Sequence, residues 1–197
     1  MPRMMQMNAI DLLKDDHRRV QDLFSRFDSA DDDHRKRELA KEAIDELQTH
    51  TLIEEEILYP TCREALGSDE LVNEAQEAHH VAKIVMTELR LMPAGDRFNA
   101  KFRNLCKAVN AHIQEEESDL FPRLQGSTLD LERMGRDMRE LRSHRAARAL
   151  AMATSPSGLI AIGAILAAIA AGIWFSTRSE SETPGQKFRR LMPSMKG

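Results

Sequence analysis

Hydrophobic positions recur every three to four residues along five stretches of the chain, which is the spacing of an amphipathic helix. The first stretch starts at Asn8, a residue type that caps helices, and carries an apolar stripe through Phe27. The next four run from Asp31–Asp33 to Tyr59-Pro60, from Ser68 to Pro93, from Asp96 to Phe121-Pro122, and from Ser127 to Leu150. Few β-branched runs interrupt these stretches, so the pattern predicts an all-α fold.

The first two stretches repeat in the next two at a fixed offset of 62 residues. Ile10 corresponds to Val72, and Leu58-Tyr59-Pro60 corresponds to Leu120-Phe121-Pro122, without a gap. A single amphipathic hairpin leaves its apolar face open to water, and two such hairpins can bury these faces against each other. We therefore expect an antiparallel four-helix bundle built from two helical hairpins that are related by a pseudo-two-fold axis.

The same offset relates six polar residues on the inward faces, namely the pairs His17 and His79, His50 and His112, and Glu54 and Glu116. In each half a His and a Glu are four residues apart, so they lie on one face of a helix together with apolar residues. A buried carboxylate without compensation costs several kcal/mol or takes up a proton. Imidazole and carboxylate groups are good ligands for iron, manganese or zinc, so the six residues predict a site for two divalent cations.

Six protein ligands leave open positions on two octahedral ions, and Glu54 and Glu116 are the expected shared ligands. Open positions indicate chemistry with small molecules such as water, O₂, NO or peroxide. His80 falls off the apolar phase, and we expect it at the surface or behind the ligands, while His34 and His144 are expected in solvent.

Residues adjacent to the predicted ligands have other expected roles. Glu55 and Glu117 face away from the ligands by about 100°, at the surface or in support of them. Tyr59 and Phe121 are expected to pack at the ends of the bundle, with a hydrogen bond from Tyr59 to a bound ligand as the alternative. The two cysteines, Cys62 and Cys106, lack the spacing of a metal motif and are expected as buried or partly buried thiols.

At these residues the chain resembles the hemerythrin-like family with the HHE cation-binding repeat. The matching elements are Asp16-His17, His50-x-x-x-Glu54-Glu55, His79 and His112-x-x-x-Glu116-Glu117, with Leu58-Tyr59-Pro60 and Leu120-Phe121-Pro122. The resemblance implies two non-haem iron ions bridged by carboxylates and oxygen. It also implies a function in binding O₂ or NO, in sensing oxygen or iron, or in iron supply and repair.

The chain departs from one branch of that family. O₂-carrying hemerythrins have an additional His one turn after the third-helix His, where this chain has Lys83. The ligand set is therefore symmetric, with four His and two Glu. This resembles the iron-sensing and iron–sulfur-repair branches more closely than the O₂ carriers.

A second region is apolar and uncharged, from Gly158 to Phe175. A membrane-spanning helix needs about 20 apolar residues, so residues 156–177 are expected to cross a bilayer, with Trp174 at the interface. A buried helix, or one filling a groove of a partner, is the alternative. Small residues recur every four positions, which favours a homodimer through this face. Six Arg before the span and four basic residues after it favour a single-pass protein whose larger domain faces the cytoplasm.

The expected organisation follows from these regions. Residues 1–7 form an N-terminal extension and residues 8–126 the hemerythrin-like bundle. Residues 127–155 form a connector helix to the membrane span at 156–177, and residues 178–197 a disordered tail.

Composition and motifs argue against several classes of protein. The chain has 28 Lys and Arg against 32 Asp and Glu, which gives a net charge of −4. It lacks the basic patch that is typical of nucleic-acid-binding proteins. Ferritin-like di-iron proteins use two Glu-x-x-His motifs, and this chain has only the one from Glu77 to His80. A zinc peptidase motif, His-Glu-x-x-His, is absent.

We therefore predict a membrane-anchored di-iron protein that binds or senses O₂, NO or peroxide, or takes part in iron homeostasis. Binding or sensing is favoured over catalysis. The alternatives are an enzyme that turns over peroxide or NO or oxidises Fe(II), and a structural adaptor clamped by its metal.

Overall fold

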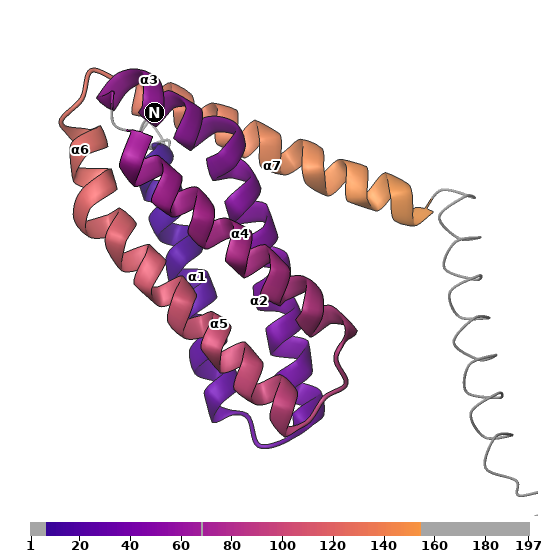
Figure 1. Ribbon diagram of the computed structural model, residues 1–197. Helices are drawn as coiled ribbons and strands as arrows, with labels where there is room; N and C mark the ends of the chain where they lie inside the picture. Colours follow the sequence, from indigo (N-terminus) through magenta and orange to yellow (C-terminus); the bar gives the residue numbers. More distant parts are fainter. Residues whose placement is uncertain (1–6, 68, 155–197) are drawn as a thin grey trace, which may run out of the picture. The chain divides into compact units, whose positions relative to one another are not determined.

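Every regular element that the structure describes is helical, which confirms the predicted all-α class. The structure is a computed structural model, and it describes residues 7–67 and 69–154. Four long helices form the body shown in Figure 1, namely α1 (Ala9–Ser29), α2 (Asp33–Ile53), α4 (Asp69–Leu91) and α5 (Asp96–Glu115).

Helices that follow one another in the chain pack as pairs. α1 lies along α2 and α4 along α5, and further contacts join α2 to α4 and α1 to α5. The Asn8 side chain caps α1 by accepting a bond from the Asp11 N–H at 3.0 Å, as the sequence predicted. The fourth stretch begins at Asp96 as expected, with Gly95, whose φ is 134°, at the cap position before it.

Two π-helical segments lie at matched positions of the repeat, η1 (Glu54–Leu58) and η2 (Glu116–Leu120). Each begins at a predicted metal ligand, and each leads directly into a short helix, α3 (Tyr59–Leu66) or α6 (Phe121–Gln125). The prediction that the second and fourth stretches end at the aromatic-proline pairs was wrong. Each proline occupies the first turn of the next helix, a position that tolerates proline, and the chain stays helical through it.

The buried apolar side chains form two groups. One lies toward the α1–α2 and α4–α5 loops and includes Phe24, Phe27 and Phe102. The other lies toward α3, α6 and the start of α1, and includes Leu13, Tyr59 and Phe121. His17 lies in the sequence between members of the two groups, so the polar residues form a layer between them.

The fifth stretch is α7 (Leu131–Thr154), and its first half packs on the bundle. Met134 and Met138 are buried in the same apolar group as Ile10 and Leu13. The sequence predicts that this stretch connects the bundle to a membrane span. The structure adds that its first half has a buried face on the bundle.

None of the helices in residues 7–67 and 69–154 has the length and apolar character needed to cross a membrane. The predicted span at 156–177 and the predicted tail at 178–197 lie outside the described residues, as do residues 1–6 of the N-terminal extension.

Candidate metal centre

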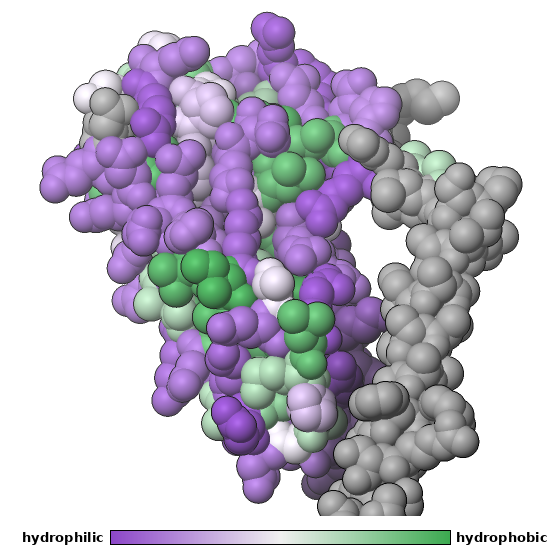
Figure 2. Space-filling view, turned by 45° about the vertical axis from the view of Figure 1, so that its right-hand side comes forward, coloured by the Kyte–Doolittle hydropathy of each residue, from purple (hydrophilic) through white to green (hydrophobic). Residues whose placement is uncertain are grey.

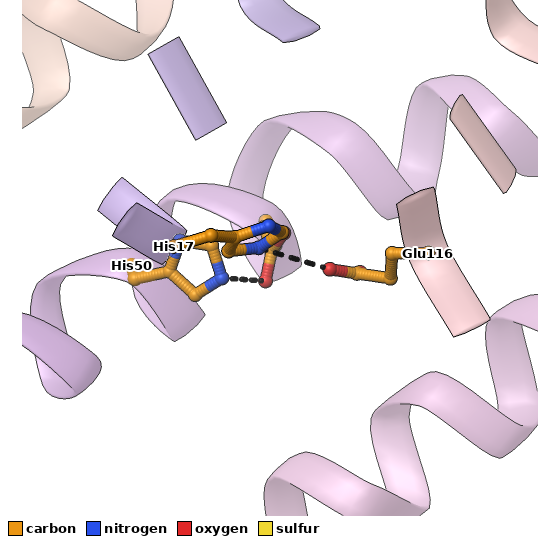
Figure 3. Close-up of side chains that lie close together, drawn as sticks. His17, His50 and Glu116 are labelled. Carbon is orange, nitrogen blue, oxygen red and sulfur yellow. Dashed lines mark ion pairs between the residues drawn. The ribbon is translucent and has the colours of Figure 1, made fainter. Parts of the chain in front are cut away.

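The six predicted ligands come together in two overlapping groups. Donor atoms of His17, His50, Glu54 and Glu116 lie within 4.8 Å of one another, and so do those of Glu54, His79 and His112. Each group takes its two His from one hairpin. Glu54 belongs to both groups, as expected of a shared ligand. Figure 3 shows His17 beside His50, with Glu116 pointing toward them from another helix.

In the first group, each His Nε2 atom lies close to a carboxylate oxygen of a Glu. His17 Nε2 lies 3.4 Å from Glu116 Oε2, and His50 Nε2 lies 3.1 Å from Glu54 Oε2. The rings of His17 and His50 are 4.9 Å apart and meet edge to face.

The second group repeats this arrangement. His79 Nε2 lies 3.0 Å from His112 Nε2 and 3.2 Å from Glu54 Oε2. The two rings are 4.8 Å apart, again edge to face. Glu116 Oε1 lies 3.6 Å from His112 Nε2, so this carboxylate also reaches toward the second group.

The donor set fits metal ions better than it fits a network of hydrogen bonds. Both carboxylate oxygens of Glu54, together with Glu116 Oε2 and His17 Nε2, are buried and make no hydrogen bond to any described residue. Ligand atoms about 2.1 Å from an ion and at right angles lie about 3.0 Å apart, close to the separations seen here. The prediction that these six bind metal stays a prediction, and the structure places them where they can do so.

Three of the four His have a carboxylate on the ring nitrogen that faces away from the ligand cluster. Glu117 Oε1 lies 2.8 Å from His17 Nδ1, and Glu55 Oε1 lies 3.3 Å from His79 Nδ1. Such carboxylates fix the tautomer and orientation of a metal-binding ring. Glu55 and Glu117 therefore support the ligands, one of the two roles expected from the sequence.

The two remaining His differ. Nδ1 of both rings is buried and makes no hydrogen bond to any described residue. Only His50 has a carboxylate within ion-pair range of this atom, because Asp16 Oδ2 lies 3.7 Å away. The residue that corresponds to Asp16 in the second repeat is Ala78, which has no polar side chain.

The surrounding charges separate the pKa values of the two rings, with Glu54 contributing most at His50. Burial lowers the pKa of His50, but Glu54 and Asp16 outweigh burial and raise it to about 10. Burial dominates at His112 and lowers its pKa. Burial also works against ionised Glu54, yet His50 and His79 hold its pKa well below the usual value.

Tyr59 and Phe121 occupy matched positions of the repeat but make different contacts with the ligands. Phe121 stacks on the His17 ring with centroids 5.7 Å apart and planes 7° apart. The Tyr59 hydroxyl donates to Glu116 Oε1 at 3.1 Å and lies 3.2 Å from His79 Nε2. Packing was the expected role of both. For Tyr59 the structure adds a hydroxyl directed at the ligands, with its pKa raised by burial and by Glu54 and Glu116.

A cavity of about 620 Å³ leads from the ligands toward the surface. Much of its wall comes from α4 and α5, including Ala82, Val85, Ala108 and Val109, and all four predicted His ligands line it. Large hydrophobic side chains are exposed on α4, among them Val81 and Ile84. Figure 2 shows hydrophobic patches among hydrophilic side chains on one face of the molecule.

The other singled-out residues lie largely as expected. His34, His80 and His144 are exposed, Cys62 is buried and Cys106 is half-buried. Burial raises the pKa of both thiols to about 12. Lys83 binds Glu55 at 2.5 Å and stays outside the ligand cluster.

Two residues near the ligands escaped the sequence analysis. Asp16 appeared only as part of the Asp16-His17 motif, and its position just before a ligand was the available signal. Arg142 on α7 bonds Asp16, and nothing in its spacing distinguished it from the other Arg of that helix.

Comparison with known proteins agrees with the arrangement. The family model of the Hemerythrin HHE cation binding domain matches residues 8–124. The crystal structure of a Hemerythrin HHE cation binding domain-containing protein from Mycobacterium kansasii aligns with a TM-score of 0.64. It covers 77% of this chain and 94% of that one, and at 23% identity it shows the fold alone.

A curated protein of Nostoc sp., named DNA nickase, is 28% identical over 115 residues. The alignment covers 58% of this chain and 33% of the Nostoc protein, so the chain spans about a third of that relative's length.

Proposed function

The chain belongs to the hemerythrin HHE cation-binding family, and on that premise we propose that it holds two iron ions and binds or senses a small oxidant such as O₂, NO or peroxide. The observation that carries the proposal is the pair of overlapping donor groups that share Glu54. His17 and His50 would hold one ion, and His79 and His112 the other. Glu54 and Glu116 would be shared between them.

Iron is favoured by the family, and the donor set of imidazoles and carboxylates also admits manganese or zinc. When bound, two iron ions with open positions would supply reversible one-electron chemistry toward a small ligand. The protein's own residues would govern how that ligand arrives and what it meets.

The cavity supports access by an exogenous molecule. One water molecule occupies about 30 Å³ in the liquid. A cavity of about 620 Å³ is therefore large enough for O₂, NO or peroxide. Its apolar walls favour uncharged ligands over ions. Phe121 covers the His17 ring and excludes water from that side.

A second candidate, turnover of peroxide, is favoured by Tyr59. Its hydroxyl holds a proton within hydrogen-bond distance of Glu116 and His79. A proton donor beside the metal-binding cluster suits the cleavage of a peroxide better than simple binding.

We also propose that residues 156–177 anchor the protein in a membrane, on the basis of their uncharged apolar composition. Fractionation of cells that express the full chain or residues 1–155 tests this. The full chain is expected with the membranes and the shorter chain outside them.

We propose no action on DNA. The Nostoc relative carries that name, but the aligned region is a third of its length, and this chain has a net charge of −4.

The decisive experiment measures metal content and optical spectra of the full chain, purified without oxygen and then exposed to air. About two iron per chain, with new charge-transfer absorption on exposure, is the expected result. Stoichiometric loss of added hydrogen peroxide would indicate binding or a single oxidation, and continued loss would indicate turnover. One zinc per chain, or a folded protein without metal, would leave the structural adaptor as the better account.

A further inference from the structure

Asp16 is a buried carboxylate outside the two donor groups. It is 2% exposed, and guanidinium groups of Arg19 and Arg142 bind its two oxygens. Its Oδ2 atom, which accepts from Arg142, is also the one that lies 3.7 Å from His50 Nδ1. Burial of a carboxylate costs free energy unless the charge is paired, so the position of Asp16 behind His50 needs an explanation.

Arg142 brings α7 into this arrangement. The guanidinium comes from a helix outside the two hairpins, and its Nε atom is buried without a hydrogen-bond partner among the described residues. The chain of contacts therefore runs from α7 through Arg142 and Asp16 to His50.

The position of α7 is fixed by packing as well as by this ion pair. Met138 is fully buried and Met134 is 6% exposed. Both lie on the face of α7 that carries Arg142, which follows Met138 by about one turn and Met134 by about two. A side chain on Gly135 would place its Cβ 2.8 Å from backbone atoms of Asn8 and Ala9. Only glycine permits this approach, so α7 docks closely on the start of α1.

The second hairpin has no equivalent arrangement. Ala78 stands where the first hairpin has Asp16, so the carboxylate that lies 3.7 Å from His50 Nδ1 has no counterpart at His112. Any influence of α7 on the ligands should therefore fall on one pair of His and leave the other unchanged.

We propose that Asp16 and Arg142 are positioning residues for His50, so that docking of α7 sets the affinity and surroundings of the ion held by His17 and His50. This inference rests on the proposed two-metal function. Coupling between two sites is reciprocal, so metal binding at this pair also stabilises docked α7. Residues 155–197 follow α7 in the chain, so a change in the docking of α7 could pass from the metal-binding residues to that segment.

The first test compares Arg142→Gln with Arg142→Lys and with the control Arg136→Gln, whose side chain is exposed on the same helix. Ferrous ion is titrated into each metal-free full chain against a competing chelator. Loss of an outer partner of a metal-binding His costs about 10–100-fold in affinity. We expect that loss for one of two ions in Arg142→Gln, partial rescue in Arg142→Lys, and none in the control.

A spectroscopic measurement separates positioning from general destabilisation. Mössbauer spectra of iron-loaded protein should show one of two iron signals altered in Arg142→Gln and both unaltered in the control. Should Arg142→Gln fail to fold, Gly135→Ala offers a second variant. It displaces α7 and keeps both Arg142 and Asp16 in the chain, and it is expected to alter the same iron signal.

Hydrogen exchange of residues 131–144 provides the reciprocal test. Metal loading should slow exchange there in the unaltered chain and in Arg136→Gln, and should have little effect in Arg142→Gln. Equal affinities, spectra and exchange in all variants would overturn the proposal while leaving the two-iron centre intact. Failure of the unaltered chain to bind two ions would instead overturn the proposed function.

Discussion

The two hairpins carry matching ligands and differ in the apolar side chains around them. At seven matched core positions the second hairpin has the smaller side chain, as in Phe27 against Leu89 and Val20 against Ala82; the other pairs are Ile10 and Val72, Leu13 and Ala75, Leu23 and Val85, Phe24 and Met86, and Leu47 and Val109. The order is reversed at two buried pairs, Ala40 and Phe102, and Ala43 and Leu105. The cavity that reaches the ligands has much of its wall on the second hairpin.

The polar surroundings of the two pairs of His also differ. Asp16 lies 3.7 Å from His50 Nδ1 and is itself bound by two Arg, whereas the described residues place no carboxylate on Nδ1 of His112. The repeat therefore supplies two metal-binding pairs that both line the cavity, and divergence has changed the charged groups behind them.

The largest expected effect comes from the shared ligand. Glu54 belongs to both donor groups and its repeat partner Glu116 to one, so Glu54→Ala should abolish binding of both ions. Glu116→Ala should retain part of the metal. Metal content per chain after purification measures this, and equal loss in the two variants would show that the carboxylates are equivalent.

The next effect concerns the apolar core. Phe27→Ala should lower the free energy of unfolding by about 3–5 kcal/mol and Leu89→Ala by about 2–5 kcal/mol, because each leaves a cavity. Both side chains are buried, at 0% and 1% exposure, so the larger ring should cost more. Denaturant unfolding of the metal-free chains measures both, and the reverse order would contradict the expectation that the larger side chain leaves the costlier cavity.

The pH dependence of stability should also distinguish the hairpins. A His with a raised folded pKa stabilises the protein fully below its unfolded value of 6.5, and that stability is lost as the pH rises through about 10. His50 should therefore make metal-free protein less stable from pH 7 to 10. His112, with a lowered pKa, should cost stability only as the pH falls below 6.5.

Unfolding of His50→Gln and His112→Gln across this range tests the difference. His50→Gln should flatten the alkaline loss of stability, and His112→Gln should leave it in place. An unchanged alkaline slope in His50→Gln would assign that loss to other groups.

Filling the cavity should affect access and leave metal content intact. Ala82→Leu places a larger side chain in the wall between α4 and α5, while Ala100→Leu, at an exposed position of α5 outside the cavity, is the control. We expect several-fold slower reaction of the reduced iron protein with O₂ in Ala82→Leu alone, measured by stopped-flow absorption. Equal rates in both would mean that the ligand enters elsewhere.

The smallest expected effect comes from making the two aromatic positions alike. Tyr59→Phe removes the hydroxyl that contacts Glu116 and His79 and reproduces the side chain of Phe121. A lost hydrogen bond of about 1 kcal/mol corresponds to roughly five-fold weaker binding of a ligand that accepts it. Azide titration of the oxidised protein measures this, and a much larger loss of peroxide consumption would identify Tyr59 as a proton donor in turnover.

Periodicity was a reliable guide to the helices because each must bury a continuous apolar stripe. It gave no sign of the π-helical turns at Glu54 and Glu116, because the widening of one turn changes the bonding of the backbone and leaves the pattern of apolar residues nearly intact. It also indicated an end at each aromatic-proline pair, since a missing N–H often ends a helix. Here the proline falls in the first turn of the following helix instead.

The sequence by itself determined the all-α class, the repeat and the six inward-facing polar residues. It could do so because helical spacing and a fixed offset are local properties that read directly from residue order. Only the tertiary structure decided that Glu54 rather than Glu116 lies in both donor groups, that the Tyr59 hydroxyl faces the ligands, and that Arg142 reaches Asp16. These contacts join residues that are distant in the sequence, and which of many similar side chains meet is fixed by packing of the helices.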